Sequence, residues 1–245
     1  PAGVVVEHDV VEQAVNVRKH QDFTRKCGEI LHEKHPDASI YFNSGGADQY
    51  QPEFHGASTH FELEDLPTAW GGYNKMPPRA RYFANTGKDY LGMTGKFHLD
   101  WGEIGGFKLP EALRYEAAAM MAYGARCSIG DHLHPSGRME LETYRNIGYA
   151  YEYAEQIEPY CFNGKPAARL GLYLSGDARS DDGATNMLLE AQRDFGIMYE
   201  NNFEPFDTVI FPDCAVPDEE GVKALQAFLA RGGRVLFTGR SLVKD

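Results

Sequence analysis

The regular alternation of strand-like and helix-like segments is the feature that most restricts how this chain can fold. Short apolar runs, such as residues 59–64 and 125–131, alternate with longer stretches of helical spacing, such as 110–121 and 141–158. Strands that alternate with helices pair in parallel, because each helix returns the chain to the same end of the sheet. The sequence therefore predicts an α/β protein with parallel sheets.

The first part of the chain contains about four of these strand–helix units. Apolar residues keep helical spacing from residue 9 to about residue 34, which predicts a long helix. A closed (β/α)₈ barrel needs twice as many strands and ~250 residues in all. We therefore expect residues 1–162 to form the C-terminal half of a TIM barrel, with strands at 39–43, 59–64, 89–98 and 125–131.

The pattern restarts after Asn163 and Gly164, so a second domain is expected over residues 163–245. Its strands and helices alternate in the manner of an open, doubly wound, flavodoxin-like sheet that is cut off at residue 245. Neither GxGxxG nor GxxxxGK[ST] occurs, so no cofactor is expected. Strands are predicted at 168–175, 197–199, 208–211 and 234–237, and helices at 183–195 and 217–230.

Charge and cysteine content exclude several classes of partner. The chain has 36 acidic residues against 24 lysines and arginines, a net charge of −12. Such a surface repels phosphate backbones and anionic lipid, so neither nucleic acid nor membrane is expected as a partner. No apolar run approaches the ~20 residues that span a bilayer. The four cysteines form no CxxC pair, and free thiols favour a cytoplasmic protein.

The segment 59–64 carries the strongest chemical signal. In a barrel strand, alternate side chains point into the barrel and toward the surrounding helices. Phe61 and Leu63 suit the helix side, so His60, Glu62 and Glu64 are expected to point inward. They lie near the end of the strand where barrel active sites are found, and two carboxylates there suit general acid/base catalysis. The alternative is that one glutamate only pairs with a basic residue inside the barrel.

Polar and aromatic residues follow the next expected strand. By the same alternation Thr94, Lys96 and His98 should share a face, and Trp101 follows where a ligand could stack. A ring beside polar groups is typical of sugar recognition. The alternative is that Lys96 is only the counter-ion of a glutamate on the neighbouring strand.

The third segment, residues 130–135, contains two histidines in a His-x-His pattern next to an aspartate. His132, His134 and Asp131, completed by His98 or His60, could form a metal site. The same side chains could instead bind sugar hydroxyls or be purely structural. The predicted sugar-binding residues at the barrel mouth are Asn43, His60, Trp70, Tyr73, Lys96, His98, Trp101, Asp131, His132 and His134.

Four blocks of the sequence also resemble a known family. They are HFELEDLP (60–67), WGGY (70–73), MTGKFH (93–98) and CSIGDHLHP (127–135). As a set they look like the signature of a bacterial glycoside hydrolase family that resembles α-L-fucosidases and is allied to the family 42 β-galactosidases. The resemblance covers nearly the whole chain, and the second domain is similar to the amidotransferase-like β-galactosidase trimerisation domain.

The resemblance implies a retaining exo-glycosidase that acts on α-L-fucosides, as a homo-oligomer, possibly a trimer. The acid/base would be Glu64 or Glu62, and we favour Glu64 because it is nearer the end of its strand. The nucleophilic aspartate of α-L-fucosidases would lie before Pro1, so a longer chain is expected. The β-galactosidase nucleophile would fall at residues 93–95, which include no carboxylate.

Two other functions remain open from the sequence. One is a metal-dependent hydrolase that uses His132, His134 and His98. The other is a non-catalytic module that binds sugar or serves assembly.

Overall fold

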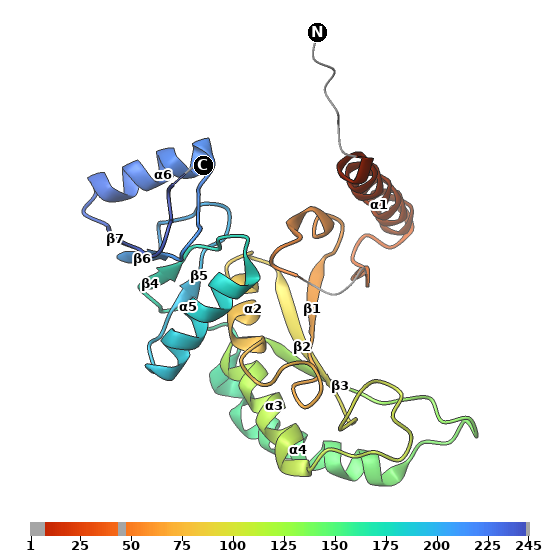
Figure 1. Cartoon of the computed structure of the whole chain (residues 1–245). Coiled ribbons are helices and arrows are strands. Elements are labelled where there is room, and N and C mark those ends of the chain that lie inside the picture. The colour runs from red at the N-terminus through yellow and green to blue at the C-terminus, as the bar shows by residue number, and fades with distance from the viewer. Residues whose placement is uncertain (1–7, 44–47, 244–245) are drawn as a thin grey trace.

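Two parallel sheets form the framework of the protein. The computed structural model describes residues 8–43 and 48–243. The first sheet has the order β1-β2-β3, and the second has the order β5-β4-β6-β7 (Figure 1). Every strand pair in both sheets is parallel, so the predicted α/β class with parallel strands is confirmed.

The first sheet consists of β1 (His60–Glu64), β2 (Asp89–Gly95) and β3 (Arg126–Gly130). Its strands pair in register, with Glu64 beside Met93 and Met93 beside Ser128. The helices α2 (Met76–Phe83) and α3 (Pro110–Ala122) pack on it. Helix α4 (Leu141–Cys161) packs on α3 and reaches β3 through the Tyr151 hydroxyl, which donates to the Cys127 carbonyl.

The side chains of β1 alternate as the sequence predicts. Phe61 and Leu63 are 3% and 0% exposed, and the ring of Phe61 lies 4.7 Å from that of Phe83 on α2. His60, Glu62 and Glu64 are half-buried on the other face of the sheet. Hence the glutamates occupy the face that α2 does not cover.

The expected strand at 39–43 is wrong. These residues adopt no regular structure, and their link to the region before β1 runs through Ile40 and Thr59. The Ile40 N–H donates to Thr59 Oγ1, whose hydroxyl in turn donates to the Ile40 carbonyl. One backbone bond, from the Thr59 N–H to the Ile40 carbonyl at 2.8 Å, joins the two segments. The N–H groups of Ile40 and Phe42 donate to side-chain hydroxyls instead, so no ladder of backbone bonds forms among the described residues. The first part therefore has three strands among the described residues, where four were expected.

The accuracy of the predicted bounds varies among helices and strands alike. The strands at 208–211 and 234–237 are confirmed to the residue, whereas the helix expected at 183–195 lies at 178–190. The N-terminal helix α1 (His8–Lys34) matches the expected 9–34. Helix α2 was not predicted from the sequence, and it contains two consecutive prolines, Pro77 and Pro78. They lie in its first turn, where a missing N–H costs no intrahelical bond.

The second sheet contains β4 (Leu170–Leu172), β5 (Gly196–Ile197), β6 (Thr208–Phe211) and β7 (Arg234–Phe237). Helices α5 (Ala178–Glu190) and α6 (Glu219–Ala230) lie on opposite sides of it (Figure 1). The helix expected at 183–195 begins at Ala178, because the Asp177 carboxylate accepts hydrogen bonds from the N–H groups of Arg179 and Ser180 and caps it there.

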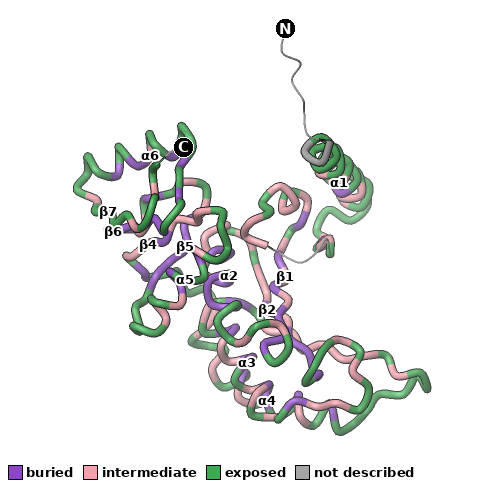
Figure 2. The backbone as a smooth tube through the Cα atoms, viewed as in Figure 1, coloured by how far each residue is buried: buried purple, intermediate pink, exposed green. Residues whose placement is uncertain are grey.

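One hydrophobic core joins the two sheets through α2. Phe61, Leu63 and Phe83 belong to the same cluster of buried side chains as Phe195 and Ile197. Figure 2 shows buried residues on both sides of this contact, along α2 and β5. Arg81 Nε donates to the Phe195 carbonyl at 2.9 Å, and Asn85 Nδ2 donates to the Ile197 carbonyl at 2.7 Å. The second sheet is therefore fixed against the first.

Helix α1 stands away from both sheets (Figure 1). It touches the short 3₁₀ helix η1 (Pro52–Phe54), where the rings of His20 and Phe54 lie 4.8 Å apart. Several of its apolar side chains are exposed, among them Phe23 and Ile30. No helix in the described part of the chain is long and apolar enough to cross a membrane.

Candidate functional site

The carboxyl ends of β1, β2 and β3 meet at one edge of the first sheet, and the candidate residues gather there. At this edge the indole of Trp101 lies across two strand ends. A Cβ atom at Gly130 would come within 2.5 Å of that ring, and one at Gly95 within 3.1 Å. A bare backbone at Gly130 leaves room for the indole, and at Gly95 it leaves room for the rings of both Phe97 and Trp101. Trp101 thus covers the end of the sheet at β2 and β3.

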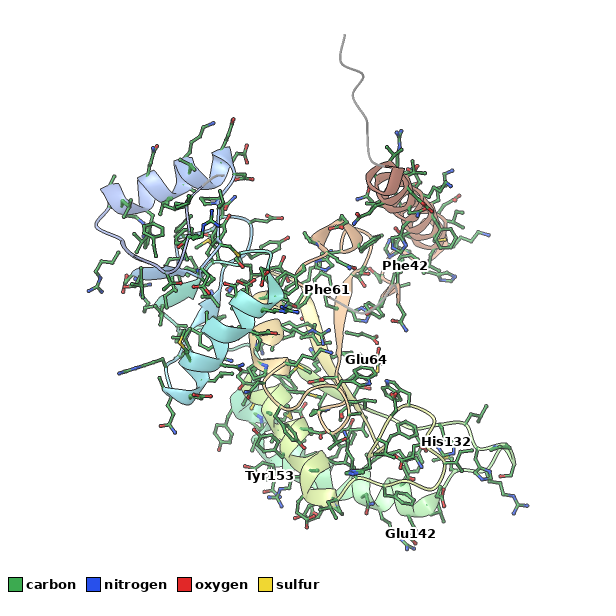
Figure 3. The ribbon with its side chains drawn as sticks, in the orientation of Figure 1. Phe42, Phe61, Glu64, His132, Glu142 and Tyr153 are labelled. Carbon is green, nitrogen blue, oxygen red and sulfur yellow. The ribbon has the colours of Figure 1, made fainter. Side chains whose placement is uncertain are left out.

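The two glutamates of β1 have different surroundings. Glu62 Oε1 lies 3.3 Å from His60 Nε2, and the ring of Tyr41 lies 5.7 Å from that of His60. Glu64 lies at the end of the strand, where its carbonyl accepts a 2.8 Å hydrogen bond from Arg79 Nη1. In Figure 3, Glu64 stands at the end of β1 and His132 lies beyond the same edge of the sheet.

Glu64, Asn43 and Trp70 line one cavity of about 610 Å³. Glu62 does not line it. Asn43 approaches from the segment before β1, and Trp70 from the loop after it. This cavity brings together three of the predicted residues from separate parts of the sequence.

The walls of this cavity are polar and carry charges of both signs. Lys75 and Arg79 supply cations, and the Lys75 Nζ lies 5.2 Å from the centre of the Trp70 ring. Asp48 and Asp182 add carboxylates. Burial lowers the pKa of Arg79, and the neighbouring carboxylate of Asp65 opposes this effect. Mixed donors and acceptors around a ring suit a ligand rich in hydroxyl groups.

Asp65 lies directly behind the site and was not predicted from the sequence. It is fully buried, and neither carboxylate oxygen has a hydrogen-bond partner within the described part of the chain. Burial raises its pKa to about 6, while Lys75 and Arg79 act in the opposite direction. The block HFELED places Asp65 next to Glu64, but alternation alone assigns it to the helix side as a turn residue.

The expected shared face of Thr94, Lys96 and His98 is wrong, because β2 ends at Gly95. Thr94 points to α3, where its hydroxyl donates to Glu116 Oε2 at 2.6 Å. Lys108 Nζ donates to the same oxygen at 2.8 Å. His98 is exposed.

Lys96 is 1% exposed, and its ammonium has no hydrogen-bond partner in the described residues. The Nζ lies 4.7 Å from the centre of the Phe107 ring. Within the described residues it forms no ion pair with Glu62 or Glu64, so the alternative interpretation of Lys96 as a glutamate's counter-ion is wrong.

The predicted metal fragment does not assemble into a ligand set. Asp131 Oδ1 lies 3.6 Å from His132 Nδ1, and His134 Nδ1 is 2.7 Å from Ser136 Oγ. Both ring nitrogens of His132 are buried without a hydrogen bond. Across residues 8–43 and 48–243, no group of three His, Cys, Asp or Glu side chains is placed to hold a metal ion. The metal hypothesis therefore has no ligand set in these residues.

The two aromatic residues of the WGGY block, Trp70 and Tyr73, lie in different surroundings. Trp70 Nε1 donates to Asp100 Oδ1 at 3.3 Å and so ties the loop after β1 to the loop after β2. Tyr73 instead donates to Glu116 Oε1 at 3.2 Å, beside α3. Trp70 belongs to the 610 Å³ cavity, whereas Tyr73 lines a small void of about 30 Å³ next to Asp65.

Another cavity, of about 570 Å³, lies at the opposite end of the first sheet. It is lined by Asp89 and Arg126, which begin β2 and β3, and by residues 160–168. None of the predicted site residues lines it. In open parallel α/β sheets ligands bind at the carboxyl ends of the strands, so the cavity at Glu64 is the better candidate.

Comparison with known proteins gives one informative likeness. No family model matches the chain, and no curated protein matches it. Among solved structures it is similar to the α-L-fucosidase isoenzyme 2 from Paenibacillus thiaminolyticus, with 40% sequence identity and a TM-score of 0.87. The match covers 93% of this chain and 36% of that protein, so the chain spans about a third of its length. The expected resemblance to an α-L-fucosidase is thus confirmed over most of the chain.

Proposed function

We propose that this chain is part of a glycoside hydrolase of the α-L-fucosidase type, and that Glu64 is its general acid/base. The observation that carries the proposal is the position of Glu64. Its carboxylate lies at the carboxyl end of a parallel strand and lines a polar cavity with Trp70 and Asn43. The 40% identity to an α-L-fucosidase supports the same reaction.

In this proposal residues 1–162 are the C-terminal half of a TIM barrel. Three features support it. The strands β1, β2 and β3 are parallel and in chain order, helices pack on one face, and the other face presents Glu62 and Glu64. The remaining barrel strands would come from elsewhere in a longer protein, and the 36% coverage of the similar fucosidase fits this.

The second unit, residues 163–245, would be a flavodoxin- or amidotransferase-like domain of the trimerisation type. The strand order β5-β4-β6-β7 supports this, because doubly wound sheets place the first strand beside the second and third. A homo-oligomer in the cytoplasm is part of the same proposal.

In the proposed reaction the two glutamates have different roles, and only Glu64 is one of the two catalytic carboxyl groups. A retaining glycosidase holds two carboxyl groups ~5–5.5 Å apart, one to attack the anomeric carbon and one to protonate the leaving oxygen. Glu64 would protonate that oxygen and then activate water in the second step. Glu62 lies ~6–7 Å back along the strand, beside His60, and would bind a sugar hydroxyl. The nucleophile would come from a segment outside this chain.

The experiment is hydrolysis of aryl glycosides by the whole protein that contains this chain. We expect turnover of an aryl α-L-fucoside, release of α-L-fucose as the first product by NMR, and much weaker turnover of an aryl β-D-galactoside. Fucose binding without turnover would contradict catalysis and favour a sugar-binding module. Release of β-L-fucose would contradict the retaining mechanism.

A further inference from the structure

One face of α5 forms part of the cavity that contains Glu64. Ala178, Asp182 and Asn186 all line it. Residues four apart on a helix lie on the same face, so the three side chains form one continuous wall. This wall belongs to the second unit, more than a hundred residues after Glu64 in the sequence.

The position of α5 relative to Glu64 is fixed by bonded and packed groups. The Tyr50 hydroxyl donates to Asp181 Oδ2 at 3.0 Å, and Asp181 Oδ1 accepts from the Ser175 N–H at 2.9 Å. Tyr50 lies in the segment before β1 and itself lines the cavity. These contacts and the shared core around α2 hold α5 in a fixed position at the site.

The chemistry of the wall suits a second sugar. Asp182 offers acceptors, and Asn186 offers both a donor and an acceptor, which is the combination that vicinal hydroxyls require. Burial raises the pKa of Asp182. The cavity volume of about 610 Å³ lies within the ~300–1,000 Å³ of sites that enclose a drug-sized ligand, so there is room for more than the one sugar that reacts.

We propose that α5 forms the binding site for the sugar that leaves, with Asp182 and Asn186 hydrogen-bonded to its hydroxyl groups. The inference rests on the proposed function and adds the substrate class: fucosylated di- or oligosaccharides, selected by contacts from the second unit. A simple aryl leaving group has no hydroxyls for these side chains to bind.

The test measures kcat/KM of the whole protein for a fucosyl disaccharide and for an aryl α-L-fucoside. Asp182→Ala and Asn186→Ala should each lower the disaccharide value by about tenfold, the loss expected for hydrogen bonds to a bound hydroxyl. The value for the aryl fucoside should stay within about twofold. The controls are Glu190→Ala and Met187→Ala on the same helix. Both are exposed and outside the cavity, and both should leave the two substrates unaffected.

The outcomes separate this inference from the function it rests on. If the wild type does not hydrolyse the aryl fucoside, both the proposed function and the α5 sugar site are wrong. If the wild type hydrolyses it but Asp182→Ala and Asn186→Ala leave the disaccharide unaffected, the α5 site alone is wrong. Equal losses on both substrates would also overturn it, because they would indicate a general effect on folding or on the fucosyl site.

Discussion

The buried carboxylate of Asp65, beside the site, lowers the stability of the folded protein at neutral pH. Burial raises its pKa to about 6, above the ~3.9 of an unfolded chain. The folded protein therefore binds a proton that the unfolded chain has lost, and stability falls as the pH rises through this window. Above pH 6 the folded state holds a buried carboxylate that has no hydrogen-bond partner among residues 8–43 and 48–243.

Replacing Asp65 with asparagine should remove this cost. We expect Asp65→Asn to be more stable than the wild type at pH 7.5, by up to about 3 kcal/mol, and the difference to disappear near pH 4. Urea unfolding at several pH values measures it. The exposed Asp37→Asn serves as the control. A variant that is less stable than the wild type at pH 7.5 would show that the ionised carboxylate makes a stabilising interaction in the folded protein.

Residues such as Phe61 and Leu63 could be predicted from the sequence, because burial along a strand follows from a two-residue pleat. Glu64 could be placed for the same reason. Lys96 and Arg79 could not, because their burial depends on Phe107 and on the packing of α2, neither of which is encoded in local spacing. Charged residues that tertiary contacts bury leave no periodic signal.

At the scale of the element, the end of β3 depends on the absence of a side chain at Gly130. An added Cβ would lie within 2.5 Å of the Trp101 ring. We expect Gly130→Ala to displace the indole and to cost about 1–3 kcal/mol of stability, as overpacking does. Near-ultraviolet circular dichroism and urea unfolding report the two effects. At Gly56 an added Cβ would meet nothing within 4 Å, so Gly56→Ala should leave both readouts unaffected. An unchanged spectrum for Gly130→Ala would contradict the position of Trp101.

Elements whose structure depends only on neighbouring residues were predicted better than elements that depend on distant contacts. Helix α1 was predicted almost to the residue because its length and spacing are local. The strand expected at 39–43 fails because a strand needs a partner, and the Thr59 side chain takes the hydrogen bond that a partner would make. The cavity wall from α5 was missed for a similar reason, since it depends on how two sheets meet.

At the scale of the molecule, the shared core predicts that both sheets unfold together. Phe195 is 1% exposed within that core, and the Arg81 guanidinium lies 4.4 Å from the centre of its ring. Both tryptophans lie in the first part of the chain, so their fluorescence reports that part, while far-ultraviolet circular dichroism reports the whole. We expect the two transitions to coincide.

Phe195→Ala should shift both transitions together, by about 3–5 kcal/mol of lost stability. The exposed Tyr160→Ala should have little effect on either. Separate transitions, or a shift of one only, would show that the two sheets fold independently.

The proposed role of Glu64 as general acid/base is tested most directly by substitution in the whole protein. Glu64→Gln should lower kcat/KM strongly for fucosides with poor leaving groups and much less for activated aryl fucosides, which need little protonation. Azide should then restore turnover of the activated substrate, because it attacks the glycosyl intermediate without a general base. Glu62→Gln is the matched comparison and should depress both substrates alike. If neither variant shows dependence on the leaving group, the acid/base lies outside β1 and the assignment is wrong; if Glu62→Gln alone shows it, the two roles are exchanged.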